Sequence, residues 1–270
     1  MKPISTKTIF IDLDGTLMND EKEITSETSA AVIRAKAAGH EIIISSGRSF
    51  PYVAYRNGQI GNVCRYAVTS TGSMVYDFVE KEILAINPIP TEAVSELLHF
   101  DHPNISWHFH CSDGLFANVE GDKGVSILTT QPLDEFQKTK TVVAICIAGY
   151  DFDLMKSLEA NILKVPGVHI TNRHKALVDE SFPKHGIYYY DITAEGVSKG
   201  IGVSALQKHL NLDPANCIAI GDDNNDIAMF VQCGTKVAMG NSIPTVKQVA
   251  DIIIDDNNAD GVAKFLDTLK

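Results

Sequence analysis

Short apolar runs alternate with helix-like stretches along the first seventy residues. Residues 8–13 and 41–45 are apolar runs that end in polar residues and a glycine, as buried strands do. Between them, residues 26–38 place alanine and isoleucine near helical spacing, and Gly39 follows as a stop signal. A second helix-like stretch leads to a third apolar run at 66–70. This alternation predicts an α/β fold, a parallel sheet with helices on its faces.

The pattern changes near residue 82 and returns near residue 188. In between, apolar positions and turn residues predict short strands, a hairpin and a helix, which is typical of an α+β domain. After residue 188, strands and helices alternate again. We therefore expect a discontinuous core of residues 1–81 and 188–270, with residues 82–187 inserted as a second domain.

Composition limits the kind of partner. The chain has 270 residues, enough for one large domain or two modest ones, and 44% hydrophobic with 21% charged residues is ordinary for a globular protein. Its formal net charge of -11 argues against nucleic acid as a partner, because phosphate backbones attract basic surfaces. An acidic protein can still bind a phosphate ester where a metal ion and a basic side chain reverse the local charge.

The cysteines and the chain start predict a compartment. Five cysteines are scattered without a C-x-x-C pair, which favours reduced thiols over disulfides or a zinc site. The first residues lack the long apolar stretch of a signal peptide. No run of roughly 18 apolar residues predicts a membrane span. We expect a cytoplasmic protein without a membrane partner.

Two aspartates at the end of the first predicted strand give the first chemical signal. Asp12 and Asp14 stand two residues apart, and their carboxylates would repel each other if both were free and close. A divalent cation that binds such oxygens relieves the repulsion. Gly15 allows a sharp turn whose N–H groups can face an anion. Ligands of parallel sheets bind beyond the carboxyl ends of the strands, where both aspartates fall.

Three further polar elements fall at predicted strand ends or helix starts. Ser46-Gly47-Arg48 follows the second strand, and its hydroxyl and N–H groups can bind phosphate oxygens. Lys199 opens a predicted helix, and the acidic run 222–226 lies between a predicted strand and a helix. Each element alone is typical of caps, turns or solvated surface. Together they supply a nucleophile, phosphate donors, a cation and metal ligands.

In these motifs and their order, the chain resembles the haloacid dehalogenase (HAD) superfamily of phosphohydrolases, and more narrowly its Cof-type branch. The resemblance covers essentially the whole chain. It implies a Rossmann-like doubly wound parallel-sheet core (HAD-like), with an inserted α+β cap that covers the crevice and chooses the leaving group. It also implies Mg²⁺ as the cofactor.

The resemblance implies a role for each motif residue. Asp12 matches the nucleophile and also a metal ligand. Asp14 matches the general acid–base, and its backbone carbonyl matches a metal ligand. The other matches are Ser46, Gly47, Lys199 and Asn225 for phosphate binding, Asp222 as a magnesium ligand, and Asp226 in support of the metal site. Folding is therefore expected to bring Asp12 and Asp222 to one cation.

The implied activity is that of a magnesium-dependent phosphatase. It would hydrolyse a small phosphorylated metabolite, a sugar phosphate or similar phosphomonoester, through an aspartyl phosphate on Asp12. A phosphotransferase such as a phosphomutase stays open, although residues 16–45 are too few for the small helical cap typical of mutases. A non-catalytic phosphometabolite-binding protein also stays open. The substrate and the oligomeric state, monomer or dimer, are undetermined.

Two regions bear on substrate contacts. Thr71 stands where members of the family commonly have Asn, and it offers a hydroxyl in place of an amide. The candidate contacts in the cap are His108, His110, Arg173, His174 and Lys175. The two first histidines alternate with Trp107 and Phe109, which we expect in the cap core. Residues 173–175 are expected to form a solvated basic turn.

Overall fold

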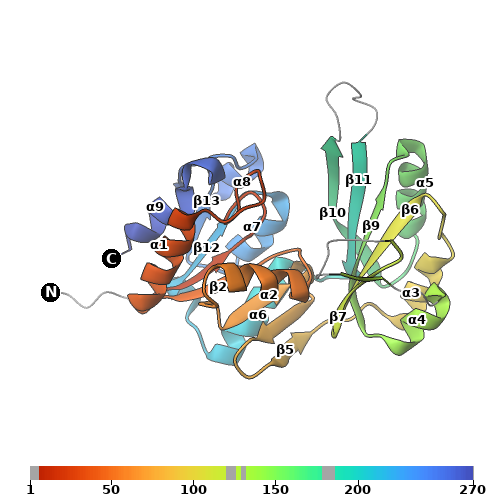
Figure 1. The fold of residues 1–270 in the computed structure, drawn as a ribbon, viewed down its shortest axis with the longest axis horizontal. Coiled ribbons are helices and arrows are strands. Elements are labelled where there is room, and N and C mark those ends of the chain that lie inside the picture. Colours follow the sequence, from red (N-terminus) through yellow and green to blue (C-terminus); the bar gives the residue numbers. More distant parts are fainter. Residues whose placement is uncertain (1–5, 120–125, 129–131, 178–185, 270) are drawn as a thin grey trace. The chain divides into compact units, whose positions relative to one another are not determined.

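The structure, a computed structural model, describes most of the chain and divides it into two compact units, each with its own sheet (Figure 1). The described residues are 6–119, 126–128, 132–177 and 186–269. The first unit comprises Met1–Arg48, Tyr52–Ala85 and Ser198–Lys270, and the second comprises Ser49–Pro51 and Ile86–Val197.

The first unit is built on an eight-stranded sheet. Its strands lie in the order β14 (Ile252–Ile253), β13 (Thr235–Ala238), β12 (Cys217–Gly221), β1 (Thr8–Ile11), β2 (Glu41–Ser45), β3 (Tyr66–Thr69), β4 (Met74–Asp77) and β5 (Glu82–Ile86). Neighbouring strands from β14 to β3 are parallel, and β4 is antiparallel to β3. This arrangement confirms the predicted α/β fold.

Helices cover both faces of this sheet, which explains why its central strands are continuous apolar runs. The helices are α1 (Ser26–Ala37), α2 (Phe50–Gln59), α6 (Lys199–Leu210), α7 (Asn224–Phe230), α8 (Pro244–Val249) and α9 (Gly261–Asp267). On one face, Phe10, Ile43 and Val68 share a core with side chains of α6, α7 and α8. The opposite face carries the fully buried Ile42 and Ile44, and α1 lies beside α9 (Figure 1).

The carboxyl ends of the central strands meet at one edge of the sheet. β1 ends one residue before Asp12, β2 ends one residue before Ser46, and β12 ends one residue before Asp222. Because these three strands are parallel neighbours, the polar motifs that follow them lie side by side.

The second unit has a six-stranded sheet, antiparallel except for its last pair. The order is β10 (Val168–Leu177), β11 (Gly186–Ala194), β9 (Val142–Gly149), β6 (Ile105–Cys111), β7 (Gly114–Ala117) and β8 (Ser126–Leu128). Side chains of α3 (Thr91–Leu98), α4 (Leu133–Thr139) and α5 (Phe152–Ile162) pack on one face with Trp107 and Phe109. The expected burial of these two aromatic residues is thus confirmed.

The structure differs from the sequence expectations for this region at three places. The two units divide after Ala85 rather than after residue 81, because β5 belongs to the eight-stranded sheet, and after Val197 rather than after residue 187, which lies inside β11. Antiparallel pairing with β9 and β10 holds β11 in the second unit up to Ala194. The turn expected at residues 173–175 is wrong, because these residues lie within β10 and pair with β11.

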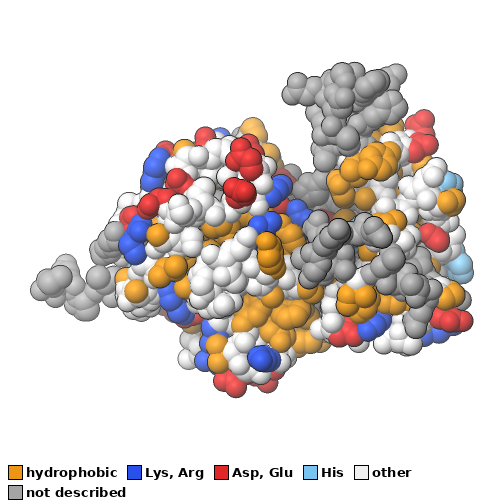
Figure 2. All heavy atoms as spheres, in the orientation of Figure 1, with side chains coloured by type: hydrophobic (Ala, Val, Ile, Leu, Met, Phe, Trp, Pro, Cys, Tyr) orange, Lys and Arg blue, Asp and Glu red, His pale blue; other side chains and the backbone are white. Residues whose placement is uncertain are grey.

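On the face drawn in Figure 2, acidic and basic side chains are interspersed. Within the described part of the chain, no helix is long and apolar enough to cross a membrane.

Candidate active site

Asp12 lies in a buried ion cluster. Its residue is 5% exposed, and its Oδ1 accepts a hydrogen bond from the Lys199 ammonium at 2.5 Å. The same ammonium donates to Asp226 Oδ1, also at 2.5 Å, and Lys199 is only 1% exposed. Lys199 is the first residue of α6, so the helix start delivers a cation to the carboxyl end of β1. We call Asp12, Lys199 and Asp226 the buried cluster.

Asp226 is fully engaged by the protein. While its Oδ1 accepts from Lys199, its Oδ2 accepts from the backbone N–H groups of Asp222 and Asp223, at 2.9 and 3.1 Å. Together with the Asp223 side chain it forms a capping box at the start of α7. Asp226 therefore fixes the loop after β12 and orients Lys199.

Asp222 is held from the other side by the turn after β1. Its Oδ1 accepts from the Thr16 hydroxyl at 2.8 Å. Gly15 lies so close that an added Cβ would stand 2.4 Å from Asp222 Oδ2. With a φ of +76°, this position needs glycine for its conformation and for the approach of the two loops.

Three carboxylates of these loops are spaced as metal ligands. Asp12, Asp222 and Asp226 each offer an oxygen, and these oxygens lie within 4.8 Å of one another. An oxygen-only, acidic donor set suits Mg²⁺. Because both Asp226 oxygens already accept protein hydrogen bonds, Asp12 and Asp222 are the better fit for direct ligands. Asp226 fits a supporting position.

Burial and the neighbouring carboxylates raise the pKa of Asp12 and of Asp222. Burial, and next the neighbouring charges of Asp226 and Asp222, raise the pKa of Asp12 well above its ordinary value, against the attraction of Lys199. Burial and the charge of Asp226 raise the pKa of Asp222 to about 7. Burial alone would lower the pKa of Lys199, but the carboxylates of Asp12 and Asp226 outweigh it and raise that pKa. A divalent cation would favour the ionised carboxylates.

Asp14 has a different environment, although it is two residues from Asp12. Its carboxylate accepts two hydrogen bonds from the Arg48 guanidinium, at 2.8 and 2.7 Å, and one from Lys22 at 3.1 Å. Burial would raise its pKa, but these two cations hold the pKa of Asp14 well below its usual range. The Arg48 guanidinium also lies 4.9 Å from the ring centroid of the buried Tyr52. We call Asp14, Arg48 and Lys22 the outer cluster.

The predicted phosphate-binding residues fall on neighbouring loops. Ser46 is buried directly after β2, and its Oγ accepts from the Arg48 N–H at 3.1 Å. Gly47 follows, and an added Cβ there would lie 3.4 Å from the Thr71 hydroxyl, an ordinary contact. Thr71 has a φ of 58°, which is unusual for a β-branched residue. Asn225 lies half-buried in the first turn of α7, beside Asp226.

The structure therefore brings Asp12, Lys199, Asp222 and Asp226 together, with Ser46 and Asn225 on adjoining loops. Sequence reasoning assigned no role to Thr16, Arg48 or Lys22. Thr16 and Arg48 lie inside recognised motifs, so their positions could have drawn attention. Lys22 has no such signal, since only the fold brings it to Asp14.

In the second unit, His108 and His110 lie on β6 and alternate with the buried Trp107 and Phe109. Arg173 is exposed and pairs with Glu159 at 2.5 Å. The side chains of His174 and Lys175 lie outside the described part of the structure. The contact of any of these residues with substrate stays a prediction.

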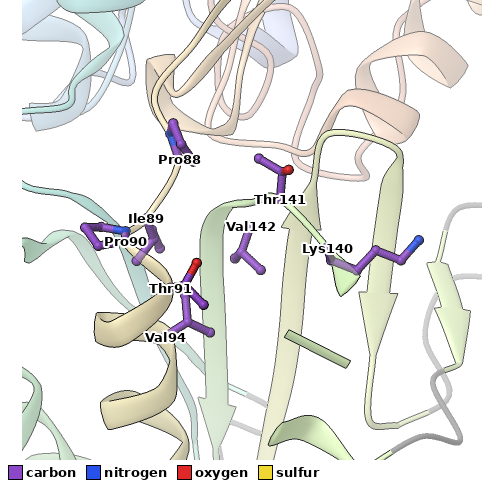
Figure 3. Close-up of a pocket in the computed structure, with 8 residues that line it drawn as sticks. All are labelled: Pro88, Ile89, Pro90, Thr91, Val94, Lys140, Thr141 and Val142. Carbon is purple, nitrogen blue, oxygen red and sulfur yellow. The ribbon is translucent and has the colours of Figure 1, made fainter. Parts of the chain in front are cut away.

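A pocket of about 270 Å³ in the second unit is not a second candidate for the active site. It is lined by residues 88–91, 94 and 140–142, none of which is a carboxylate or a predicted site residue. Its charged residue, Lys140, has its amine directed away from Pro88 and Ile89 (Figure 3), pairs with Asp113 and lies over the Phe116 ring. The pocket therefore lacks an available group for phosphate chemistry.

The chain is similar to known proteins along nearly its whole length. A sequence profile described as haloacid dehalogenase-like hydrolase matches residues 9–266. The 5-amino-6-(5-phospho-D-ribitylamino)uracil phosphatase YcsE of Bacillus subtilis (strain 168) is 28% identical over 270 residues, which cover 97% of this chain and 95% of that protein. The pyridoxal phosphate phosphatase YbhA of Escherichia coli (strain K12) is 27% identical over 274 residues, which cover 97% of this chain and 98% of that protein.

A solved structure supports the fold independently. The crystal structure of a haloacid dehalogenase-like hydrolase from Bacteroides thetaiotaomicron matches with a TM-score of 0.81 at 24% identity. The match covers 98% of this chain and 100% of that one. Likeness at this identity extends to the fold and not to the substrate.

Proposed function

Because this chain belongs to the haloacid dehalogenase-like hydrolase family, we propose that it is a magnesium-dependent phosphatase acting on small phosphorylated metabolites. Asp12 is the nucleophile, and it carries the phosphoryl group as an aspartyl phosphate before water releases it. The single observation that supports this best is the buried ammonium of Lys199, 2.5 Å from both Asp12 and Asp226.

The buried cluster answers the main electrostatic problem of the reaction. A phosphate monoester arrives as a dianion, and a carboxylate nucleophile alone would repel it. Lys199 places a full positive charge beside Asp12, and both side chains are buried, where such a charge acts more strongly than in water. Asp12, Asp222 and the Asp14 carbonyl would hold Mg²⁺, which would supply further positive charge against the phosphate. Ser46, Gly47 and Asn225 lie on the adjoining loops and complete the proposed phosphate site.

Asp14 is the proposed general acid and base. It protonates the departing oxygen when Asp12 attacks phosphorus, and it then takes a proton from the water that hydrolyses the aspartyl phosphate. Asp14 is paired with Arg48 and Lys22, so it has to leave these cations to reach the leaving group. We therefore assign Asp14 an orientation during turnover that differs from the paired one.

The names of two relatives support the proposed substrate class. The two relatives above are named as phosphatases of a ribitylamino-uracil phosphate and of pyridoxal phosphate, both small phosphomonoesters. We propose that the second unit chooses the leaving group, with His108 as the first candidate contact. Replacing His108 by alanine should then change the ranking of phosphorylated metabolites by kcat/KM. An unchanged ranking would exclude His108 as a substrate contact.

Phosphate release tests the proposed function. The purified chain should release inorganic phosphate from p-nitrophenyl phosphate with Mg²⁺ and stop in EDTA. Asp12→Asn should lose at least about a thousandfold in kcat, because an amide is not a competent nucleophile. When wild-type protein is mixed with ³²P-labelled substrate and then quenched in acid, the protein should carry covalent label. Asp12→Asn treated in the same way should carry none. Equal activity of the two proteins would reject Asp12 as the nucleophile. Phosphate transfer only to an added acceptor would favour a phosphotransferase, and ligand binding without turnover would favour a binding protein.

A further inference from the structure

Two buried hydroxyls of the first unit have no hydrogen-bond partner within the described part of the chain. They belong to Ser45 and Ser73, and both residues are 0% exposed. A buried hydroxyl without a partner destabilises the fold, because it has given up its hydrogen bonds to water and gained none in the protein. Such groups are few in folded proteins, so each one calls for an explanation.

Ser45 is the neighbour of Asp12 in the sheet. β1 and β2 pair in parallel up to Ile11 beside Ile44, and one further residue on each strand places Ser45 beside Asp12. Asp12 continues the ladder, because its backbone N–H still donates to the adjacent strand β12.

Both side chains point toward α6. Phe10 and Ile43 belong to the core that packs against α6 and α7. Residues two apart on a strand share a face of the sheet. Asp12 and Ser45 each follow one of these core residues by two positions, so they lie on the face from which Lys199 reaches down.

The side chain of Lys199 crosses this position. At one end, an added Cβ on Gly72, between β3 and β4, would lie 3.1 Å from Lys199 Cα. At the other end, the ammonium lies 2.5 Å from Asp12 Oδ1, at the end of β1. Since β2 lies between β1 and β3, the lysine side chain passes over β2 at the level of Ser45.

We propose that Ser45 is a positioning residue that holds the Lys199 ammonium during turnover. The ammonium has three N–H donors, of which two point to Asp12 and Asp226. When Asp12 carries the phosphoryl group, its carboxylate no longer attracts the ammonium as a full anion. The Ser45 oxygen then serves as the replacement acceptor, which keeps Lys199 at the phosphoryl group instead of letting it withdraw to Asp226. This inference rests on the proposed phosphatase function.

Ser73 provides a matched control. It lies two residues before Val75, which belongs to the same core, so its buried hydroxyl faces the same side of the sheet. However, Ser73 precedes β4, and two strands separate it from Asp12. Removal of either hydroxyl takes away one unpaired buried group, but only Ser45 lies beneath the Lys199 side chain where it extends to Asp12.

Steady-state kinetics of Ser45→Ala and Ser73→Ala separate the two positions. For Ser45→Ala we expect kcat to fall about tenfold and KM to fall with it, so that kcat/KM stays within about twofold of wild type, because the lost contact is made only after Asp12 is phosphorylated. For Ser73→Ala we expect kcat to stay within about twofold of wild type. Both variants should unfold at or above the wild-type temperature, since each loses an unpaired hydroxyl. An unchanged kcat in Ser45→Ala, or an equal loss in Ser73→Ala, would overturn the proposal.

A second readout does not depend on turnover. Beryllofluoride with Mg²⁺ mimics an aspartyl phosphate, and the ¹⁵N–¹H signal of the Lys199 ammonium, assigned by its loss in Lys199→Arg, reports its hydrogen bonds. In this complex the signal should shift and exchange faster with water in Ser45→Ala, but not in Ser73→Ala. Identical signals in all three proteins would reject the role of Ser45. Failure to form the complex, together with absent phosphate release, would instead reject the phosphatase function.

Discussion

The buried cluster and the outer cluster hold two aspartates that are neighbours in sequence but opposites in environment. The Asp12 side chain is 7% exposed, whereas the Asp14 side chain is 29% exposed. Burial and nearby carboxylates raise the pKa of Asp12. Against the effect of burial, Arg48 and Lys22 lower the pKa of Asp14. Spacing in sequence therefore does not decide the chemistry of a carboxylate; the charges and the water around it do.

This difference also ranks the consequences of substitution. Charges in a water-free site depend on one another, and loss of one partner leaves the others uncompensated. Charges near the surface exchange their partners for water at little cost. We therefore expect substitutions in the buried cluster to damage stability and activity together, and substitutions in the outer cluster to affect mainly the proton transfers.

Lys199→Met should give the largest loss of stability. Asp12 and Asp226 would remain buried without their cation, and we expect a loss of about 3–5 kcal/mol in the free energy of unfolding. Activity should fall by at least about a hundredfold, because the positive charge next to the nucleophile is gone. Urea unfolding in EDTA and phosphate release measure the two losses. Lys264→Met is the control, since its pair with Asp255 is exposed, and it should change neither. If Lys199→Met is as stable as wild type, the charges of the buried cluster do not depend on one another more than those of the outer cluster do.

Asp14→Asn should separate proton transfer from nucleophilic attack. An alkyl phosphate needs a proton on its departing oxygen, so its kcat should fall about 10²–10⁴-fold. p-Nitrophenyl phosphate has a leaving group that departs as an anion, so its aspartyl phosphate should still form, and only the later hydrolysis should slow. Rapid-quench measurement of the first turnover distinguishes the two steps. Equal loss of the first turnover with both substrates would argue that Asp14 positions the substrate instead.

Much of the first unit could be predicted from local pattern. The strand expected at 41–45 and the helix start at Lys199 agree with β2 and α6, because apolar runs and helix starts are encoded within a few residues. The meeting of Asp12 with Asp222 follows from a general rule for parallel sheets, in which strand ends gather at one edge.

The remaining features depend on contacts that local sequence does not encode. Residues 173–175 are polar and suggested a turn, but β11 pairs with them and extends the strand. Pairing of β11 with β9 and β10 carries the second unit beyond residue 187. Lys22 donates a hydrogen bond to Asp14, and its own backbone has a φ of 62°, a conformation that the local sequence does not predict. Each of these depends on tertiary partners.

The proton affinity of Asp222 predicts how stability depends on pH without metal. Its pKa is about 7 in the folded protein, against an ordinary value of 3.8, mainly through burial and the charge of Asp226. Between these values the folded protein keeps a proton that the unfolded chain releases. Raising the pH through this window therefore removes stability, by about 1.4 kcal/mol per pH unit at most, and the loss is complete above pH 7.

Thermal unfolding in EDTA between pH 5 and 8, compared with saturating Mg²⁺, measures this effect. Asp222→Asn is the matched variant, because it cannot titrate and should remove this part of the pH dependence. Mg²⁺ should do the same, since it binds the ionised carboxylate. A slope in EDTA that Asp222→Asn leaves unaltered would assign it to other groups.

Arg48→Gln should give the smallest effect and the sharpest test of the outer cluster. It removes both Arg48 hydrogen bonds to Asp14, so the pKa of Asp14 should rise toward its ordinary value, as followed by its ¹³C carboxyl signal. The pair stabilises the fold above the unfolded pKa and loses that effect as the pH falls through the lowered one. At pH 7 the loss of stability should stay below about 1 kcal/mol, because the Arg48 side chain is 45% exposed. Arg48→Lys keeps the positive charge but cannot donate two parallel hydrogen bonds to one carboxylate. Its Asp14 pKa should therefore lie between those of wild type and Arg48→Gln. If the Asp14 signal titrates as in wild type, Lys22 alone holds the carboxylate, and the outer cluster reduces to a single ion pair.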